Sequence, residues 1–118
     1  MTPAHGVHLI AELDGCERMP DLVAMQALLT AAAAAGHARL LTVELHAFGG
    51  TGGIAGVALL AESHISVHTW PEYGYAAVDV FMCGPAADPE AALAVLVEGL
   101  AARTVRTERL TRSAGSSA

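Results

Sequence analysis

Positively charged residues are scarce in this chain. Lysine and arginine together number 6 in 118 residues, against 12 aspartates and glutamates, so the formal net charge is −6. Nucleic-acid binding depends on clustered cations that neutralise phosphates, so this composition argues against a nucleic-acid partner. An acidic chain is instead compatible with a small cationic substrate.

Cysteines and membrane-length apolar runs are lacking as well. The 2 cysteines, Cys16 and Cys83, lie far apart, and no basic region leads into an apolar run at the N-terminus. We therefore expect free thiols and a cytoplasmic protein. The apolar stretch 22–35 is interrupted by Gln26 and Thr30. It is shorter than the ~20 residues that a membrane span needs, so we expect no membrane association.

Apolar residues, in contrast, make up 53% of the chain. A chain of this length can bury one core, and no linker or repeat divides it, so we expect a single domain over residues 1–118. Short apolar or alternating segments predict strands at 6–13, 39–48, 54–61, 63–70, 75–83 and 104–110.

Two further segments have the spacing of amphipathic helices. The first runs from Asp21 to Gly36, and the second begins at an expected N-cap, Asp88. Their apolar stripes consist of Leu22, Met25, Leu28, Leu29 and Ala32 in the first helix and Leu93, Leu96, Val97 and Leu100 in the second. The element order predicts an α+β two-layer sandwich, a mostly antiparallel sheet with two helices on one face. The uncovered face suits a second copy, so we expect a homodimer.

Reactive side chains are concentrated in the segment 62–83. His64 and His68 would lie about 13 Å apart on a straight strand, so one metal ion cannot bind both, and we expect no metal. A hydrolase that uses Ser63 or Cys83 with His68 is an alternative enzyme class. The chain has no Gly-x-Ser-x-Gly elbow and no evident oxyanion hole for it.

The strand expected at 63–70 alternates in character. Ile65 and Val67 point to one face, whereas His64, Ser66, His68 and Trp70 point to the other. The same alternation places Ser63 and His68 on opposite faces. They can act together only if the strand bends or bulges, or if they meet in another way.

A long motif resembles a known family. Residues 62–75 read Glu-Ser-His-Ile-Ser-Val-His-Thr-Trp-Pro-Glu-Tyr-Gly-Tyr and are followed by Asp79 and by Cys83-Gly84. This pattern is similar to the signature of the bacterial and archaeal S-adenosylmethionine decarboxylases. The opening Gly-Val-His-Leu at 6–9 also fits, as do His46 and Phe48 ahead of a glycine loop, so the resemblance extends to about Leu110.

The resemblance implies that the chain cleaves itself. In the family, the hydroxyl matching Ser63 attacks the carbonyl matching Glu62. Elimination then divides the chain into a β piece, 1–62, and an α piece, 63–118. Residue 63 becomes a pyruvoyl group, a covalent cofactor whose ketone forms a Schiff base with the substrate amine and accepts the electrons left by departing CO₂.

Other roles follow from the resemblance, position by position. His68 is similar to the family's processing base, and an imidazole exchanges protons readily near neutral pH. Cys83 is similar to the acid that protonates the substrate carbon after decarboxylation, and thiols are mostly protonated at neutral pH. Glu72 matches the carboxylate that binds the ribose hydroxyls, and Phe48 matches an aromatic residue that stacks on adenine.

The sequence departs from the family at two informative positions. Where the family has Gly-Val-Ser-Gly, this chain reads Gly53-Ile54-Ala55-Gly56, so Ala55 lacks a hydroxyl that assists processing. Asp14 stands where an aromatic residue is common, and a carboxylate there could bind the distal cation of a basic amino acid. S-adenosylmethionine is the first substrate hypothesis. The alternatives are arginine or ornithine as substrate, or a homologue that does not process itself and serves as a binding or regulatory subunit.

Overall fold

The computed structural model describes residues 5–114 as one six-stranded sheet with two helices. The strands are β1 (His5–Asp14), β2 (Leu40–Ala47), β3 (Ile54–Leu60), β4 (Ser63–Trp70), β5 (Tyr75–Cys83) and β6 (Thr104–Ser113). The helices are α1 (Leu22–Ala35) and α2 (Pro89–Leu100), and a 3-10 turn covers Pro71–Tyr73. The strand order is β2-β3-β4-β5-β1-β6, and every neighbouring pair is antiparallel.

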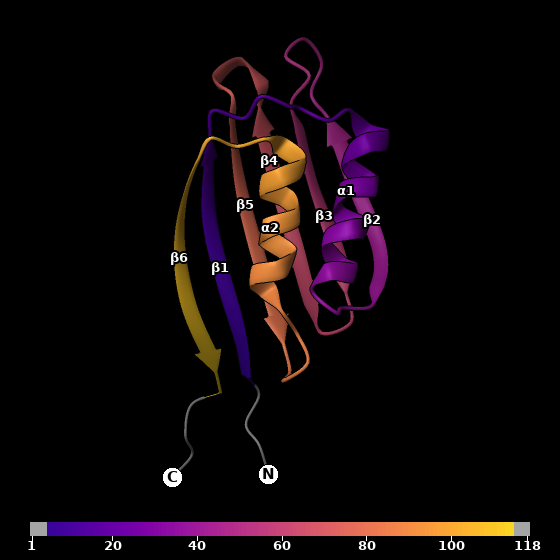
Figure 1. Ribbon diagram of the computed structural model, residues 1–118. Coiled ribbons are helices and arrows are strands. Elements are labelled where there is room, and N and C mark those ends of the chain that lie inside the picture. The colour runs from indigo at the N-terminus through magenta and orange to yellow at the C-terminus, as the bar shows by residue number, and fades with distance from the viewer. Residues whose placement is uncertain (1–4, 115–118) are drawn as a thin grey trace.

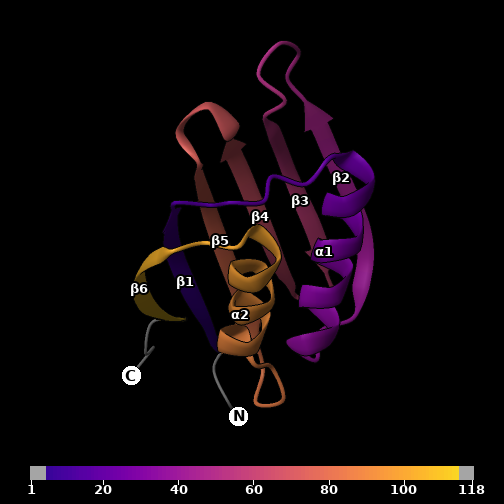
Figure 2. The same cartoon turned by 45° about the horizontal axis from the view of Figure 1, so that its top comes forward.

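Both helices lie against the same face of the sheet (Figure 1). They lie side by side and contact each other as well as the strands (Figure 2). The predicted α+β two-layer sandwich is therefore confirmed. No helix within residues 5–114 has the length and apolar character needed to cross a membrane.

Aspartates begin both helices, as their positions in the sequence predict. Asp21 Oδ1 accepts a hydrogen bond from the Ala24 N–H at 2.9 Å, and Asp88 Oδ1 accepts one from the Ala91 N–H at 3.0 Å. Each bond satisfies a backbone donor that the first turn would leave without a partner.

The core lies between the sheet and the helices. The helices contribute fully buried side chains such as Met25 and Leu29 from α1 and Leu96 and Leu100 from α2. Every second residue of the central strands faces them, as strand geometry requires. On the sheet side these residues are Leu9, Ala11 and Leu13 of β1, Ile65 and Val67 of β4, and Val78, Val80 and Met82 of β5.

Two expectations need correction at element ends. Leu22 was expected in the buried stripe of the first helix, but it is 42% exposed because it opens α1 one turn before the first buried residue, Met25. The last strand was expected to end at Leu110, but β6 continues to Ser113 because it pairs with β1 along its whole length, as far as His5↔Ser113. Cross-strand pairing extends the strand although this polar segment has only a weak local preference for strand structure.

Candidate active site

The sheet face opposite the helices, called the open face below, carries most of the predicted site residues. Alternation places His64, Ser66, His68 and Trp70 of β4 on this face, with Asp79, Phe81 and Cys83 of β5 beside them. This distribution confirms the predicted alternation of β4, because Ser63, Ile65, Val67 and Thr69 are buried on the helix side.

β4 begins and β5 ends at the end of the sheet that is lowest in Figure 1, called the lower end, so Ser63 and Cys83 lie together there. The backbone N–H of Cys83 donates a hydrogen bond to Ser63 Oγ at 3.1 Å. Ser63 is only 7% exposed, whereas Cys83 is half-buried at the edge of the open face. The β4–β5 pairing thus brings the Ser63 hydroxyl to the Cys83 backbone, 20 positions away in the sequence, while the Cys83 side chain lies on the open face.

The bond between residues 62 and 63 lies in a strained turn. Leu60 pairs with Ser63, so Ala61 and Glu62 form a two-residue connection between β3 and β4. Glu62 has a φ of +63°, a left-handed conformation that costs a residue with a Cβ about 1–2 kcal/mol. The exposed turn, the strain and the ordered Ser63 hydroxyl suit a position where a backbone bond is to be broken.

His68 lies at the opposite, upper end of the sheet, within a row of stacked rings. Its ring is 3.8 Å from the ring of Trp70 and 5.7 Å from that of Phe48, both in stacked geometry. Trp70 in turn stacks on Tyr75 at 5.1 Å. We call Phe48, His68, Trp70 and Tyr75 the aromatic row. Its Phe48 end remains 42% exposed, leaving a ring surface available to a ligand.

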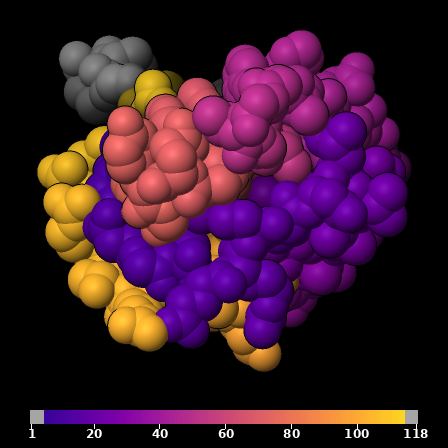
Figure 3. Space-filling view, turned by 90° about the horizontal axis from the view of Figure 1, so that it is seen from above, coloured from indigo at the N-terminus to yellow at the C-terminus, as the bar shows by residue number. Residues whose placement is uncertain are grey.

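Glu72 and Asp14 also belong to the upper end. Seen from above, the segments around residues 48–53 and 71–74 lie side by side (Figure 3). Glu72 is exposed in the 3-10 turn after β4. The Asp14 carboxylate is paired with Arg106 of β6, with Oδ2 and Nη2 3.2 Å apart.

One chain therefore does not bring the predicted residues into a single site. Ser63, Glu62 and Cys83 lie at the lower end, whereas His68, Phe48, Glu72 and Asp14 lie at the upper end. Ser63 and His68 are five residues apart on one regular strand, which corresponds to about 16 Å, and their side chains face opposite sides of the sheet. β4 has no bulge that would bring them together.

The structure adds contacts that the sequence did not indicate. His8 Nε2 lies 3.3 Å from Asp79 Oδ1, and Ser66 Oγ donates to Asp79 Oδ2 at 3.1 Å, which orders the middle of the open face. Ala55 lies directly opposite His68 on one side and His46 on the other. The pairing register that creates these neighbours is long-range, so the sequence gives no local signal for them.

The cysteines differ in their surroundings. Cys16 is buried, and its thiol donates to the carbonyl of Leu13 at 3.4 Å. Burial, and secondarily the charge of Asp14, raises the pKa of Cys16. Both thiols are free, as predicted, but only Cys83 lies beside the predicted cleavage position.

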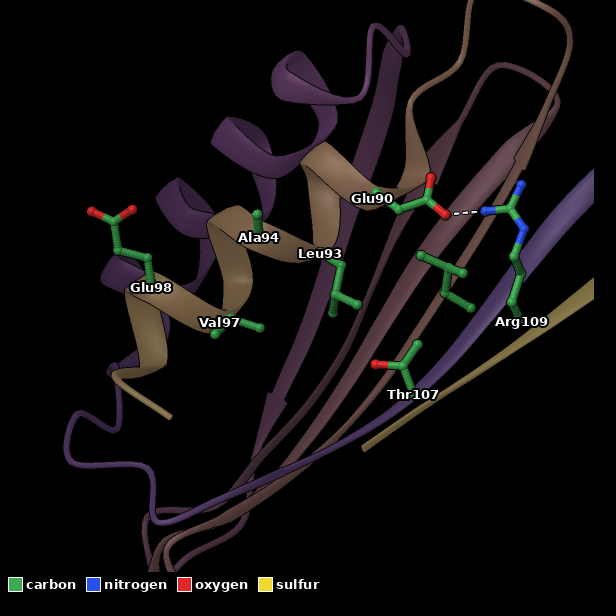
Figure 4. Close-up of a pocket in the computed structure, with 8 residues that line it drawn as sticks. Glu90, Leu93, Ala94, Val97, Glu98, Thr107 and Arg109 are labelled. Atoms are coloured by element: carbon green, nitrogen blue, oxygen red, sulfur yellow. Dashed lines mark hydrogen bonds and ion pairs between the residues drawn. The ribbon is translucent and has the colours of Figure 1, made fainter. Parts of the chain in front are cut away.

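A second hollow lies on the helix side, between α2 and β6 (Figure 4). Leu93, Val97 and Thr107 line it, and Glu90 forms an ion pair with Arg109 at its margin. It holds none of the predicted site residues, so the open face is the candidate active site.

Comparison with known proteins decides the family. The model of the S-adenosylmethionine decarboxylase family matches residues 7–113. The chain belongs to the S-adenosylmethionine decarboxylase family. A relative named S-adenosylmethionine decarboxylase proenzyme, from Thermomicrobium roseum, is 47% identical over 93 residues, which cover 79% of this chain and 80% of the relative. One of the same name from Parasynechococcus marenigrum is 50% identical over 100 residues, covering 83% and 77%.

The fold of the family agrees with this assignment. The crystal structure of the adenosylmethionine decarboxylase from Aquifex aeolicus matches with a TM-score of 0.85 and 28% identity, covering 99% of this chain and 98% of that one. Membership in the S-adenosylmethionine decarboxylase family confirms the sequence-based prediction of a decarboxylase.

The end of the aromatic row yields a prediction. Tyr75 donates a hydrogen bond to Glu12 Oε1, and this bond, followed by burial, raises the pKa of Tyr75 to about 12. In a Tyr73→Phe background, where Tyr75 is the one remaining tyrosine, ultraviolet titration should give a midpoint near this value. Glu12→Gln should lower the midpoint toward the ordinary value of about 10.

Glu44→Gln is the matched control for this titration, because Glu44 lies on β2, at the other side of the sheet. It should leave the midpoint of Tyr75 unchanged. An equal midpoint in Glu12→Gln and in the parent would show that the hydrogen bond to Glu12 does not raise the pKa of Tyr75.

Proposed function

We propose that this chain is a self-processing, pyruvoyl-dependent decarboxylase that acts on S-adenosylmethionine in the cytoplasm. The observation that carries the proposal is the lower end of the sheet, where the Ser63 hydroxyl and Cys83 adjoin a strained turn. The relatives' name, proenzyme, supports a precursor that is cleaved.

Cleavage uses the chain's own atoms. Ser63 Oγ attacks the carbonyl carbon of Glu62, and the peptide bond is replaced by an ester. Loss of the Ser63 Cα proton then breaks the bond between Ser63 Cβ and the ester oxygen and forms a Cα=Cβ double bond, which releases residues 1–62 with Glu62 as a carboxylate. Water replaces the nitrogen of the dehydrated residue, ammonia leaves, and residue 63 carries the pyruvoyl group. A base that takes up protons is needed, and His68 is the proposed one.

The residues around position 63 fit this cofactor. Ser63 is the first residue of β4 and directly follows the turn, so it would head the released α piece. The pyruvoyl ketone supplies an electron sink that no ordinary side chain offers. The Cys83 thiol donates a proton to the substrate Cα after the bond to the carboxylate has broken and CO₂ has left. Adjacency of residues 63 and 83 supports this assignment.

A homodimer would complete the site. We propose that two copies pack through their open faces with their strands running in opposite senses, related by a two-fold axis perpendicular to the strands. This arrangement places the upper end of one copy over the lower end of the other. His68, Phe48 and Glu72 of one subunit would then lie over the end of the partner's sheet that carries Ser63 and Cys83, which removes the distance that separates these groups along one chain.

The upper end favours S-adenosylmethionine as substrate. The exposed ring of Phe48 offers a stacking surface for adenine, and the Glu72 carboxylate can accept hydrogen bonds from ribose hydroxyls. Asp14 is already paired with Arg106, so its charge is compensated within the chain. An arginine or ornithine substrate would have to displace that ion pair. The substrate on either hypothesis is a small cationic amino compound.

The first test is the cleavage itself. Mass spectrometry should find two pieces, 1–62 and 63–118, the second blocked by a ketone, and Ser63→Ala should leave one intact chain. Ala55→Ser should accelerate cleavage, because the new hydroxyl would lie opposite His68. Leu59→Ser is the control, since it is on the same strand and face but lies opposite His64.

An intact wild-type chain after long incubation would refute self-processing and would favour the binding or regulatory homologue. Equal cleavage rates in Ala55→Ser and Leu59→Ser would show that a hydroxyl beside His68 does not assist cleavage.

The dimer is tested by complementation. Co-expression of a tagged Ser63→Ala chain with a His68→Ala chain forms mixed dimers that contain one intact combination, Ser63 from one subunit and His68 from the other. The His68→Ala chain should be cleaved in these dimers and should stay largely uncleaved when expressed alone. A Ser63→Ala/His68→Ala partner is the control and should rescue nothing. Failure to rescue, with a wild type that cleaves, would place both residues' roles within one chain.

The substrate is tested by two substitutions. Phe48→Ala should lower kcat/KM for S-adenosylmethionine by about tenfold or more, because stacking of a base on an aromatic ring contributes about 1–3 kcal/mol. Asp14→Asn should leave this value nearly unchanged. CO₂ release from S-adenosylmethionine, arginine and ornithine is measured for each variant. A selective loss of arginine or ornithine turnover in Asp14→Asn would instead identify a basic amino-acid decarboxylase.

A further inference from the structure

Half of the arginines in the described chain form ion pairs with carboxylates. The sequence has no lysine, and its 6 cationic residues are all arginines. Three of the four arginines near and in β6 have carboxylate partners: Arg103 with Glu17, Arg106 with Asp14, and Arg109 with Glu90. The last of these pairs faces the helix side (Figure 4).

Arg112, the fourth, is different. Among residues 5–114 it has no carboxylate within ion-pair distance, and its guanidinium carbon lies 5.5 Å from the centre of the Phe81 ring. Phe81 is flanked by His64, with ring centres 5.6 Å apart. Arg112, Phe81, His64 and Cys83 line one hollow at the lower end of the open face. The guanidinium and the proposed proton donor therefore line the same hollow, where no carboxylate of residues 5–114 pairs with the arginine.

Gly6 keeps the space between Arg112 and Cys83 free of a side chain. The three residues form one row across β5, β1 and β6, because Gly6 pairs with Cys83 on one side and with Arg112 on the other. A Cβ at Gly6 would lie 2.7 Å from two atoms of the Phe81 ring and 3.1 Å from Cys83 Sγ. Two strand spacings separate the backbones of Cys83 and Arg112, about 10 Å, a gap that the long arginine side chain can largely bridge.

The chemistry of the reaction calls for a cation at this place. The carbon that Cys83 protonates is the substrate Cα, and the carboxylate that leaves as CO₂ is bonded to that same carbon. The negative charge of the substrate must therefore arrive within one bond of the atom that faces the thiol. A guanidinium matches a carboxylate in shape and can donate two hydrogen bonds to it.

We propose that Arg112 binds the α-carboxylate of the substrate before it leaves. This inference rests on the proposed function and adds a binding residue that the sequence did not indicate. The open face of β6 is exposed in the single chain, and packing of a second subunit on that face would exclude water and strengthen the ion pair.

The interaction has a kinetic signature. Arg112 stabilises an anion that becomes neutral CO₂ as the C–C bond breaks, so it favours the bound substrate more than the transition state. Its removal should therefore raise KM, with kcat unchanged or increased. Loss of a hydrogen-bonded charge pair corresponds to an effect of about 10- to 100-fold on KM.

The test compares Arg112→Gln and Arg112→Lys with wild type, using self-cleaved protein whose extent of cleavage is measured by mass. Arg112→Gln should raise KM for S-adenosylmethionine by about tenfold or more, and Arg112→Lys should raise it less, because the charge remains. The inhibition constant of the decarboxylated product, which lacks the carboxylate, should be the same in all three proteins. Arg39→Gln is the control, since Arg39 is exposed ahead of β2, three strands away from β5, and should behave as wild type.

Each other outcome overturns the proposal. An unchanged KM in Arg112→Gln would show that the guanidinium does not meet the carboxylate. A parallel weakening of product binding would show that Arg112 shapes the site or contacts another part of the ligand. Failure of Arg112→Gln and Arg112→Lys to fold or to cleave would assign Arg112 a structural role. Failure of wild type to release CO₂ from S-adenosylmethionine would refute the proposed function itself. Failure of the proposal for Arg112 and failure of the proposed function therefore give different results.

Discussion

The helices α1 and α2 cover one face of the sheet and leave the other face without a covering layer. Residues of the central strands point alternately into the helix-covered core and onto the open face, because side chains alternate along a strand. The core face is filled by aliphatic side chains such as Leu9, Ile65 and Val80. The reactive side chains of β4 and β5 are consequently collected on the open face, and Ser63 is separated from His68 by direction as well as by distance.

Contacts between strands order both ends of the sheet. At the upper end, the aromatic row joins the loop after β2 to β4 and β5, and the bond from Tyr75 to Glu12 anchors it on β1. At the lower end, the Cys83 backbone fixes the Ser63 hydroxyl. Sites built on strands keep their geometry better than sites on loops. A dimer that joins two such ends would position reacting groups from both subunits without any large movement.

Local patterns were sufficient to predict the fold and part of the site. The alternation of β4, the cap Asp88 and most of the two helical stripes depend on neighbours a few residues away, and the structure confirms them. Pairing between distant strands leaves no such local pattern in the sequence. The contact of Ala55 with His68 depends on the β3–β4 register, and the row from Cys83 to Arg112 depends on β1 lying between β5 and β6. Motif resemblance indicated the candidate site residues, but only the strand order shows that one chain separates them into two groups.

The position of the Ala61–Glu62 turn has a consequence for how the molecule is held together. A cut there divides the sheet between two polypeptides, the first with β1, β2 and β3 and the second with β4, β5 and β6. In the order β2-β3-β4-β5-β1-β6, three of the five ladders would join the two polypeptides, and β1 would lie between two strands of the other chain. The pieces would be interleaved and could not part without dismantling the sheet. Folding must then precede cutting, and denaturation of the cut form would separate strands that can reassemble only by a concentration-dependent encounter, so its persistence would be set by the rate of unfolding.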